Sequence, residues 1–114
     1  MLVLYGLQNC DTVRKARAWL DGQSLAYRFH DFKKSGVPEA ALARWLAQAG
    51  WERLLNRPGT TWRKLDAAVQ GGVVDEVSAA AVMRDYPSVI KRPVLESGDA
   101  VIVGFDAQRY AQLR

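Results

Sequence analysis

Leu2-Val-Leu-Tyr-Gly-Leu-Gln-Asn-Cys-Asp-Thr-Val-Arg-Lys-Ala-Arg-Ala-Trp-Leu20 is the stretch of this sequence that decides the fold. Its first four residues predict a buried strand, which Gly6 ends. Residues 11–20 predict a helix, because apolar side chains recur on one face. A second strand is expected at 25–30, where apolar and polar residues alternate. Strand, helix and strand in this order form a β-α-β unit, whose two strands are parallel and joined by a right-handed crossover.

The remainder of the chain predicts a helical middle section and a C-terminal hairpin. Ser97-Gly-Asp99 is a turn signal between two apolar runs. We expect a loop at 31–36, strands at 94–96 and 100–103, and helices at about 38–48, 51–55, 61–69, 76–85 and 106–113. This order predicts an α/β, thioredoxin-like domain with a mixed sheet, spanning residues 1–114 and carrying a helical insert at about 37–87.

Composition narrows the classes of function. The 114 residues carry 16 Lys and Arg against 12 Asp and Glu, and this net charge of +4 is scattered, so we expect no nucleic-acid partner. Because the chain has one cysteine, it can form neither an intramolecular disulfide nor a Cys-X-X-Cys motif. Because it also has only one histidine, we expect no metal site. The apolar start is too short for a signal peptide or a membrane span. We therefore expect a cytoplasmic protein with no membrane partner.

Cys10 is the residue with the most distinctive position. It follows the first strand and opens the first helix, where unpaired N–H groups and the helix dipole favour a thiolate over a thiol. The positive charge of Arg14, one turn along, would lower the pKa of the thiol, whereas the neighbouring carboxylate of Asp11 would raise it. The alternative is a small buried apolar residue, the usual role of a free cysteine. A reactive thiol requires a pKa below the free-cysteine value of about 8.5.

Two segments are distinctive: Tyr5–Leu20, with Cys10-Asp-Thr-Val-Arg-Lys-Ala at its centre, and Ile90-Lys-Arg-Pro93 followed by Val94-Leu. Both segments resemble the ArsC/Spx family of arsenate-reductase-like, thioredoxin-fold proteins. The resemblance covers nearly the whole chain in the same order, and is closest to the short YffB-like branch of suspected glutathione-dependent thiol reductases. It implies that Cys10 is the nucleophile and that glutathione is a co-substrate.

The family's arsenate reductases hold arsenate with three arginines, and two of these have counterparts here. By resemblance Arg57 falls in the region of the first, and Arg92, directly before Pro93, matches the second. The third would fall near Gly104-Phe105, where neither residue is basic, and Gly6 stands where those enzymes carry a histidine. A tetrahedral anion needs several preorganised charged donors, so we expect arsenate to be a poorer substrate than a glutathione adduct.

The predicted site has Cys10 as its catalytic residue. The residues expected to bind the substrate or glutathione are Asn9, Thr12, Arg14, Arg57, Arg92 and Pro93. The bond before Pro93 is expected to be cis, because X-Pro at a strand entry suits that form and the proline of this fold faces the cysteine.

Three functions compete on this evidence. The first is a glutathione-dependent thiol/disulfide oxidoreductase with a single cysteine, and arsenate reduction is its variant. Its partners would be glutathione or a small thiol or oxyanion substrate, with glutaredoxin as a further candidate. The second is a Spx-like regulator that binds RNA polymerase, although such regulators commonly carry a Cys-x-x-Cys switch that is absent here. The third is a fold that has kept no activity.

Overall fold

The computed structural model describes residues 2–113 and divides the chain into two compact units. The first unit joins the two ends of the chain, Met1–Ser35 and Arg92–Arg114, and the second is Gly36–Lys91. The second unit corresponds to the helical insert expected at 37–87. That the units form one domain stays an expectation, and its outer limits, residues 1 and 114, lie outside the described part.

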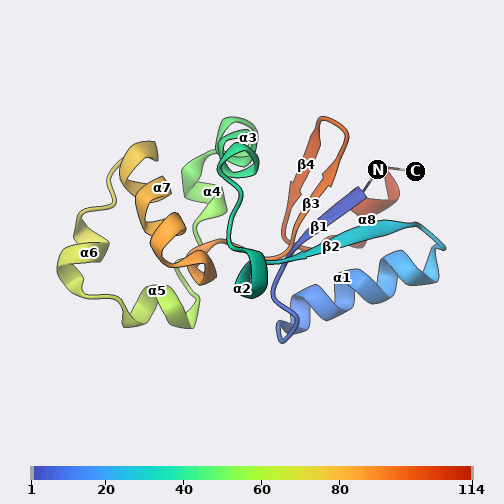
Figure 1. Ribbon diagram of the computed structural model, residues 1–114, viewed down its shortest axis with the longest axis horizontal. Helices are drawn as coiled ribbons and strands as arrows, with labels where there is room; N and C mark the ends of the chain where they lie inside the picture. The colour runs from blue at the N-terminus through green and yellow to red at the C-terminus, as the bar shows by residue number, and fades with distance from the viewer. Residues whose placement is uncertain (1, 114) are drawn as a thin grey trace. The chain divides into compact units, whose positions relative to one another are not determined.

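The first unit is built on a four-stranded sheet in the order β2-β1-β3-β4 (Figure 1). β1 pairs with β2 in parallel and with β3 antiparallel, and β4 completes a hairpin with β3. The strands are β1 (Leu2–Gly6), β2 (Tyr27–Asp31), β3 (Val94–Ser97) and β4 (Ala100–Val103); the helices are α1 (Asp11–Gly22), α2 (Phe32–Ser35) and α8 (Ala107–Ala111).

The core of the first unit lies on one face of this sheet. Leu4, Leu95 and Ile102 are register partners across β1, β3 and β4, and all three are buried. The apolar face of α1 and Tyr110 of α8 pack against this row. On the opposite face, the Tyr5 hydroxyl donates a 2.8 Å hydrogen bond to Oε1 of the buried Glu96. Side chains alternate along each strand, so the two faces are distinct.

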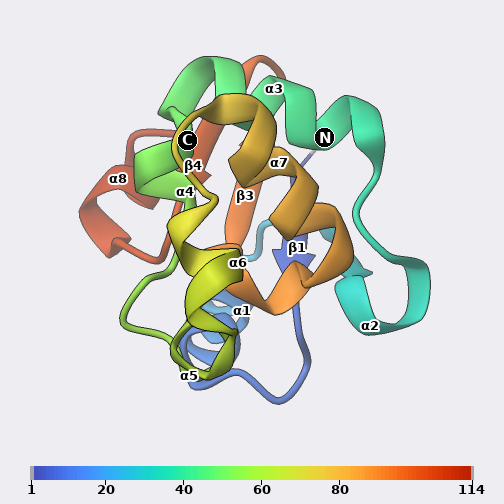
Figure 2. The same ribbon diagram turned by 90° about the vertical axis from the view of Figure 1, so that its left-hand side faces the viewer.

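The second unit is helical. Its elements are α3 (Glu39–Ala49), α4 (Trp51–Leu54), α5 (Thr60–Lys64), α6 (Ala67–Gly71), α7 (Glu76–Asp85) and the 3₁₀ turn η1 (Pro87–Val89). The helices α3 to α7 are labelled in Figure 2. Trp45 of α3 and Met83 of α7 are both fully buried within it. An isolated antiparallel bridge pairs Leu55 with Ile90, close to where the chain leaves this unit.

Several predicted elements are confirmed, and three differ. The second strand begins at Tyr27 rather than residue 25, and the loop expected at 31–36 contains α2. The helix expected at 61–69 is two short helices, because Leu65 (φ −70°, ψ 149°) and Asp66 (φ −52°, ψ 143°) leave helical geometry. Within residues 2–113, no helix is long and apolar enough to cross a bilayer.

Candidate active site at Cys10

Cys10 is held at the mouth of α1 by its own backbone. It is the N-cap residue, with extended dihedral angles (φ −90°, ψ 125°), and its carbonyl accepts the N–H of Arg14 at 3.0 Å. Its N–H donates to the carbonyl of Leu7 at 3.3 Å. The side chain is half-buried beside the sheet core. The thiol therefore lies where the first N–H groups of α1 converge.

Gly6 allows this close approach of β1 to α1. A Cβ atom on Gly6 would lie 2.7 Å from Cγ2 of Val13, and both residues are buried. A side chain at residue 6 would therefore collide with the first turn of the helix. This contact gives a physical reason why a histidine does not fit at the position that is glycine here.

Four contributions set the pKa of the Cys10 thiol. Burial raises it, but the N–H of Val13, the guanidinium of Arg92 and the N–H of Thr12 together lower it below its ordinary value. The predicted direction of the shift is confirmed. The sequence suggested Arg14 as the cation that lowers the pKa of Cys10. In the structure this cation is Arg92.

Arg14 has a different contact. Its guanidinium forms a 3.0 Å ion pair with Asp11, and both side chains are largely exposed. The two opposite charges offset each other at the helix surface. Whether Arg14 contacts a substrate stays a prediction.

Strand pairing brings Arg92 to the cysteine. The antiparallel register places Val94 opposite Tyr5, so residues 92 and 93 enter β3 beside the end of β1. The Arg92–Pro93 bond is cis, as predicted. Pro93 is buried, and its carbonyl accepts the N–H of Gly104 at 2.8 Å, which fixes the strand entry to the end of β4.

Asn9 lines a hollow of about 550 Å³ on the first unit. The other lining residues are Leu7, Gln8, Asp31, Lys33 and Lys34. No pattern in the sequence pointed to Lys33 or Lys34 as binding residues. The signal that could have found them was the predicted β-α-β unit. The carboxyl ends of its two parallel strands lie at the same edge of the sheet, so the residues that follow each strand lie close together.

Arg57 belongs to the second unit. Its guanidinium carbon lies 5.6 Å from the ring centroid of Trp51, within cation–π distance. Its assignment to the substrate site stays a prediction.

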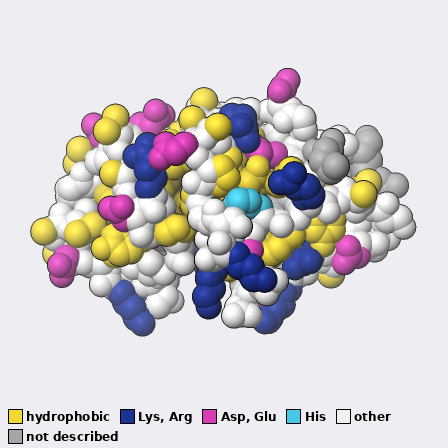
Figure 3. Space-filling view, viewed as in Figure 1, with side chains coloured by type: hydrophobic (Ala, Val, Ile, Leu, Met, Phe, Trp, Pro, Cys, Tyr) yellow, Lys and Arg dark blue, Asp and Glu magenta, His cyan; other side chains and the backbone are white. Residues whose placement is uncertain are grey.

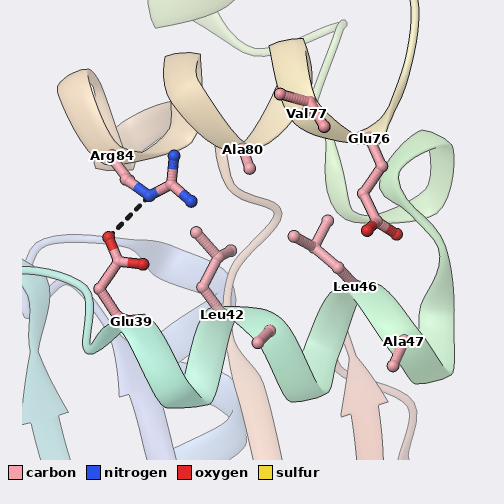
Figure 4. A pocket seen from close by; sticks show the side chains of 9 residues that line it. Glu39, Leu42, Leu46, Ala47, Glu76, Val77, Ala80 and Arg84 are labelled. Atoms are coloured by element: carbon pink, nitrogen blue, oxygen red, sulfur yellow. Dashed lines mark ion pairs between the residues drawn. The ribbon is translucent and has the colours of Figure 1, made fainter.

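A second hollow, of about 300 Å³, lies within the second unit between α3 and α7 (Figure 4). At one end of it Arg84 Nε and Glu39 Oε1 form a 2.7 Å ion pair, and Glu76 lies toward the other end. The lining residues are Glu39, Leu42, Ala43, Leu46, Ala47, Glu76, Val77, Ala80 and Arg84. These side chains include no thiol, imidazole or hydroxyl.

The described residues also bear on metal chemistry. Among residues 2–113, no group of three or more His, Cys, Asp or Glu side chains is arranged to hold a metal ion. The donor groups near the thiol are backbone N–H groups and a guanidinium, which favour an anion.

Comparison with known proteins yields matches over nearly the whole chain. The sequence profile of the ArsC family matches residues 5–113. The solved structure of a protein called YFFB is 50% identical, with a TM-score of 0.94 over 99% of this chain and 98% of the other. An arsenate reductase (ArsC) related protein from Brucella melitensis is 46% identical, with a TM-score of 0.75 over 97% and 92%.

A regulator is also similar. The global transcriptional regulator Spx of Streptococcus mutans is 26% identical over 111 residues, which cover 93% of this chain and 77% of the regulator. Together with the solved structures, these matches confirm the thioredoxin-like α/β architecture and the sequence resemblance.

Proposed function

This chain belongs to the ArsC family, and from that premise we propose that it is a glutathione-dependent thiol/disulfide oxidoreductase that works through Cys10 alone. The observation that carries the proposal is the lowered pKa of the Cys10 thiol in a chain that contains one cysteine. The thiolate is the nucleophile in disulfide exchange, and the second thiol must come from outside the protein. Glutathione supplies it in a reducing compartment such as the cytoplasm.

The reaction follows as two exchanges. The Cys10 thiolate attacks the glutathione sulfur of a mixed disulfide R–S–S–G; the S–S bond breaks, and R–S⁻ leaves and takes a proton from water. A glutathione thiolate then attacks the glutathione sulfur on Cys10, which releases oxidised glutathione and restores the Cys10 thiolate. One substrate disulfide is reduced, and two glutathione molecules end as one disulfide.

Arg92 has two effects in this scheme. It lowers the pKa of the Cys10 thiol, so a larger fraction is thiolate when the substrate arrives. A thiol of lower pKa is also the better leaving group when glutathione resolves the adduct. The predicted binding residues Asn9, Thr12 and Pro93 lie within two residues of Cys10 or of Arg92 in the chain, and their contacts with substrate are part of the proposal.

Arsenate is the less suitable substrate. Neither Gly104 nor Phe105 carries a guanidinium, and a side chain at Gly6 would meet Val13. A tetrahedral oxyanion would have Arg92 and backbone N–H groups as donors from the first unit. An anion of that charge is stabilised by several fixed cationic donors.

The test is turnover of a glutathione mixed disulfide of 2-mercaptoethanol by the whole chain, with glutathione as reductant. We expect a single glutathione adduct on Cys10 by mass spectrometry, and no adduct or turnover in Cys10→Ser. Activity of the wild type no higher than that of Cys10→Ser would refute the proposal. Efficient arsenate reduction with glutaredoxin, or binding to RNA polymerase without turnover, would replace it by the reductase or the regulator.

A further inference from the structure

We infer that the hollow beside Asn9 binds the γ-glutamyl end of glutathione, with Lys33 and Lys34 as its carboxylate anchor. This inference rests on the proposed function, because it assigns a binding subsite for the co-substrate of Cys10. Its two lysines lie outside the set of binding residues predicted from the sequence, whereas Asn9 belongs to that set.

The topology places this hollow next to the nucleophile. β1 and β2 are parallel, and Gly6 pairs with Asp31 at their ends, so residues 7–9 and 32–34 leave the same edge of the sheet. Ligands of open α/β sheets bind in the crevice outside the carboxyl ends of parallel strands. Asn9 lines this crevice and directly precedes Cys10 in the chain, so the hollow lies at the loop that carries the nucleophile.

The lining matches an amino-acid group in charge. Lys33 and Lys34 are exposed cations, and within residues 2–113 neither ammonium group forms an ion pair. Figure 3 shows basic side chains gathered over α2 and the start of α1. Two ammonium groups beside the amides of Gln8 and Asn9 suit a carboxylate.

Asp31 favours a zwitterion over a simple anion. One oxygen of its carboxylate, Oδ1, accepts the N–H of Lys33 at 2.9 Å and so fixes the start of α2. Asp31 is also one of the residues that line the hollow. For a lone carboxylate or phosphate, the charge of Asp31 would offset part of the attraction of the two lysines. The γ-glutamyl end of glutathione instead offers an ammonium group to Asp31. A volume of about 550 Å³ lies within the roughly 300–1,000 Å³ typical of small-ligand pockets.

The experiment uses S-methylglutathione, which keeps both carboxylates and the ammonium group but cannot exchange at sulfur. Binding to the whole chain is titrated by NMR at low salt. Lys33→Ala/Lys34→Ala should weaken binding about ten-fold, or about 1.4 kcal/mol. Arg63→Ala/Lys64→Ala removes two exposed adjacent cations on α5 and is the matched control, expected to change binding less than two-fold.

A second pair of measurements tests Asp31. In the wild type, N-acetyl-S-methylglutathione, which lacks the ammonium group, should bind more weakly than S-methylglutathione. In Asp31→Asn, which keeps an acceptor for the N–H of Lys33, the two ligands should bind alike. Equal binding of both ligands to the wild type would overturn the zwitterion assignment.

Failure of the subsite and failure of the proposed function give different results. If the lysine double variant binds S-methylglutathione as the wild type does, or the wild type does not bind it, the subsite is overturned even when Cys10 turns over disulfides. If binding depends on the two lysines but Cys10 forms no adduct with oxidised glutathione, the subsite stands and the proposed function fails.

Discussion

Replacing Gly6 by alanine tests how the cysteine loop is positioned. The new methyl would lie 2.7 Å from Cγ2 of Val13, a separation at which something must shift. Val13 has 0% of its surface exposed, so its side chain cannot turn toward solvent. We therefore expect the first turn of α1 to move away from β1.

The magnitude follows from two opposing effects. Overpacking of a core costs about 1–3 kcal/mol, and the lower backbone freedom of alanine in the unfolded chain offsets about 0.4–1 kcal/mol. Gly6→Ala should therefore lower the free energy of unfolding by about 1–2 kcal/mol. Because the N–H of Val13 lowers the pKa of Cys10, the shift should also raise that pKa and slow alkylation at neutral pH.

The assay combines urea unfolding with the pH dependence of iodoacetamide alkylation. Gly22→Ala is the matched control, because a Cβ there meets no atom within 4 Å. It should raise the free energy of unfolding by about 0.4–1 kcal/mol and leave alkylation nearly unchanged. Val13→Ala removes the colliding methyl, so Gly6→Ala/Val13→Ala should be more stable than the sum of the single effects by about 1 kcal/mol. Strict additivity, or a Gly6→Ala protein as stable as the wild type, would refute this account.

Three further predictions concern charge and hydrogen bonding. Arg92→Met should raise the pKa of Cys10 and slow its alkylation several-fold at neutral pH, whereas Arg14→Met should leave the midpoint of the alkylation profile in place. Tyr5→Phe removes a 2.8 Å hydrogen bond to a buried carboxylate and should lower the free energy of unfolding, measured in urea, by about 1–3 kcal/mol. A smaller loss would contradict the stabilising role of this bond. Asp75 caps α7, and its hydrogen bonds hold the pKa of its carboxyl below the usual range, so its contribution is present above the unfolded-state pKa and is lost as pH falls through the folded-state pKa. Asp75→Asn should show less loss of stability than the wild type between neutral and acidic pH, and equal losses would show that the cap does not titrate.

Local sequence patterns determined the order of the elements and the place of the cysteine. The first strand, predicted at 2–5 and observed at Leu2–Gly6, follows from apolar spacing. The helix from Asp11 and the hairpin around Gly98 likewise follow from apolar spacing and turn chemistry, which act within a few residues of the chain. The position of Cys10 at a helix N-terminus follows from the same short-range signals. The division of residues 60–71 into two helices did not, because their composition suits either arrangement.

Only the tertiary structure decided which charges face the thiol. Arg14 is close to Cys10 in sequence, yet it pairs with Asp11, whereas Arg92 reaches the thiol from the far end of the chain through the pairing of β1 with β3. The hollow with Lys33 and Lys34 likewise depends on two strand ends that meet at one sheet edge. Electrostatic interactions act through space and fall with distance between atoms, so strand register rather than sequence separation selects the cation that lowers the pKa of Cys10.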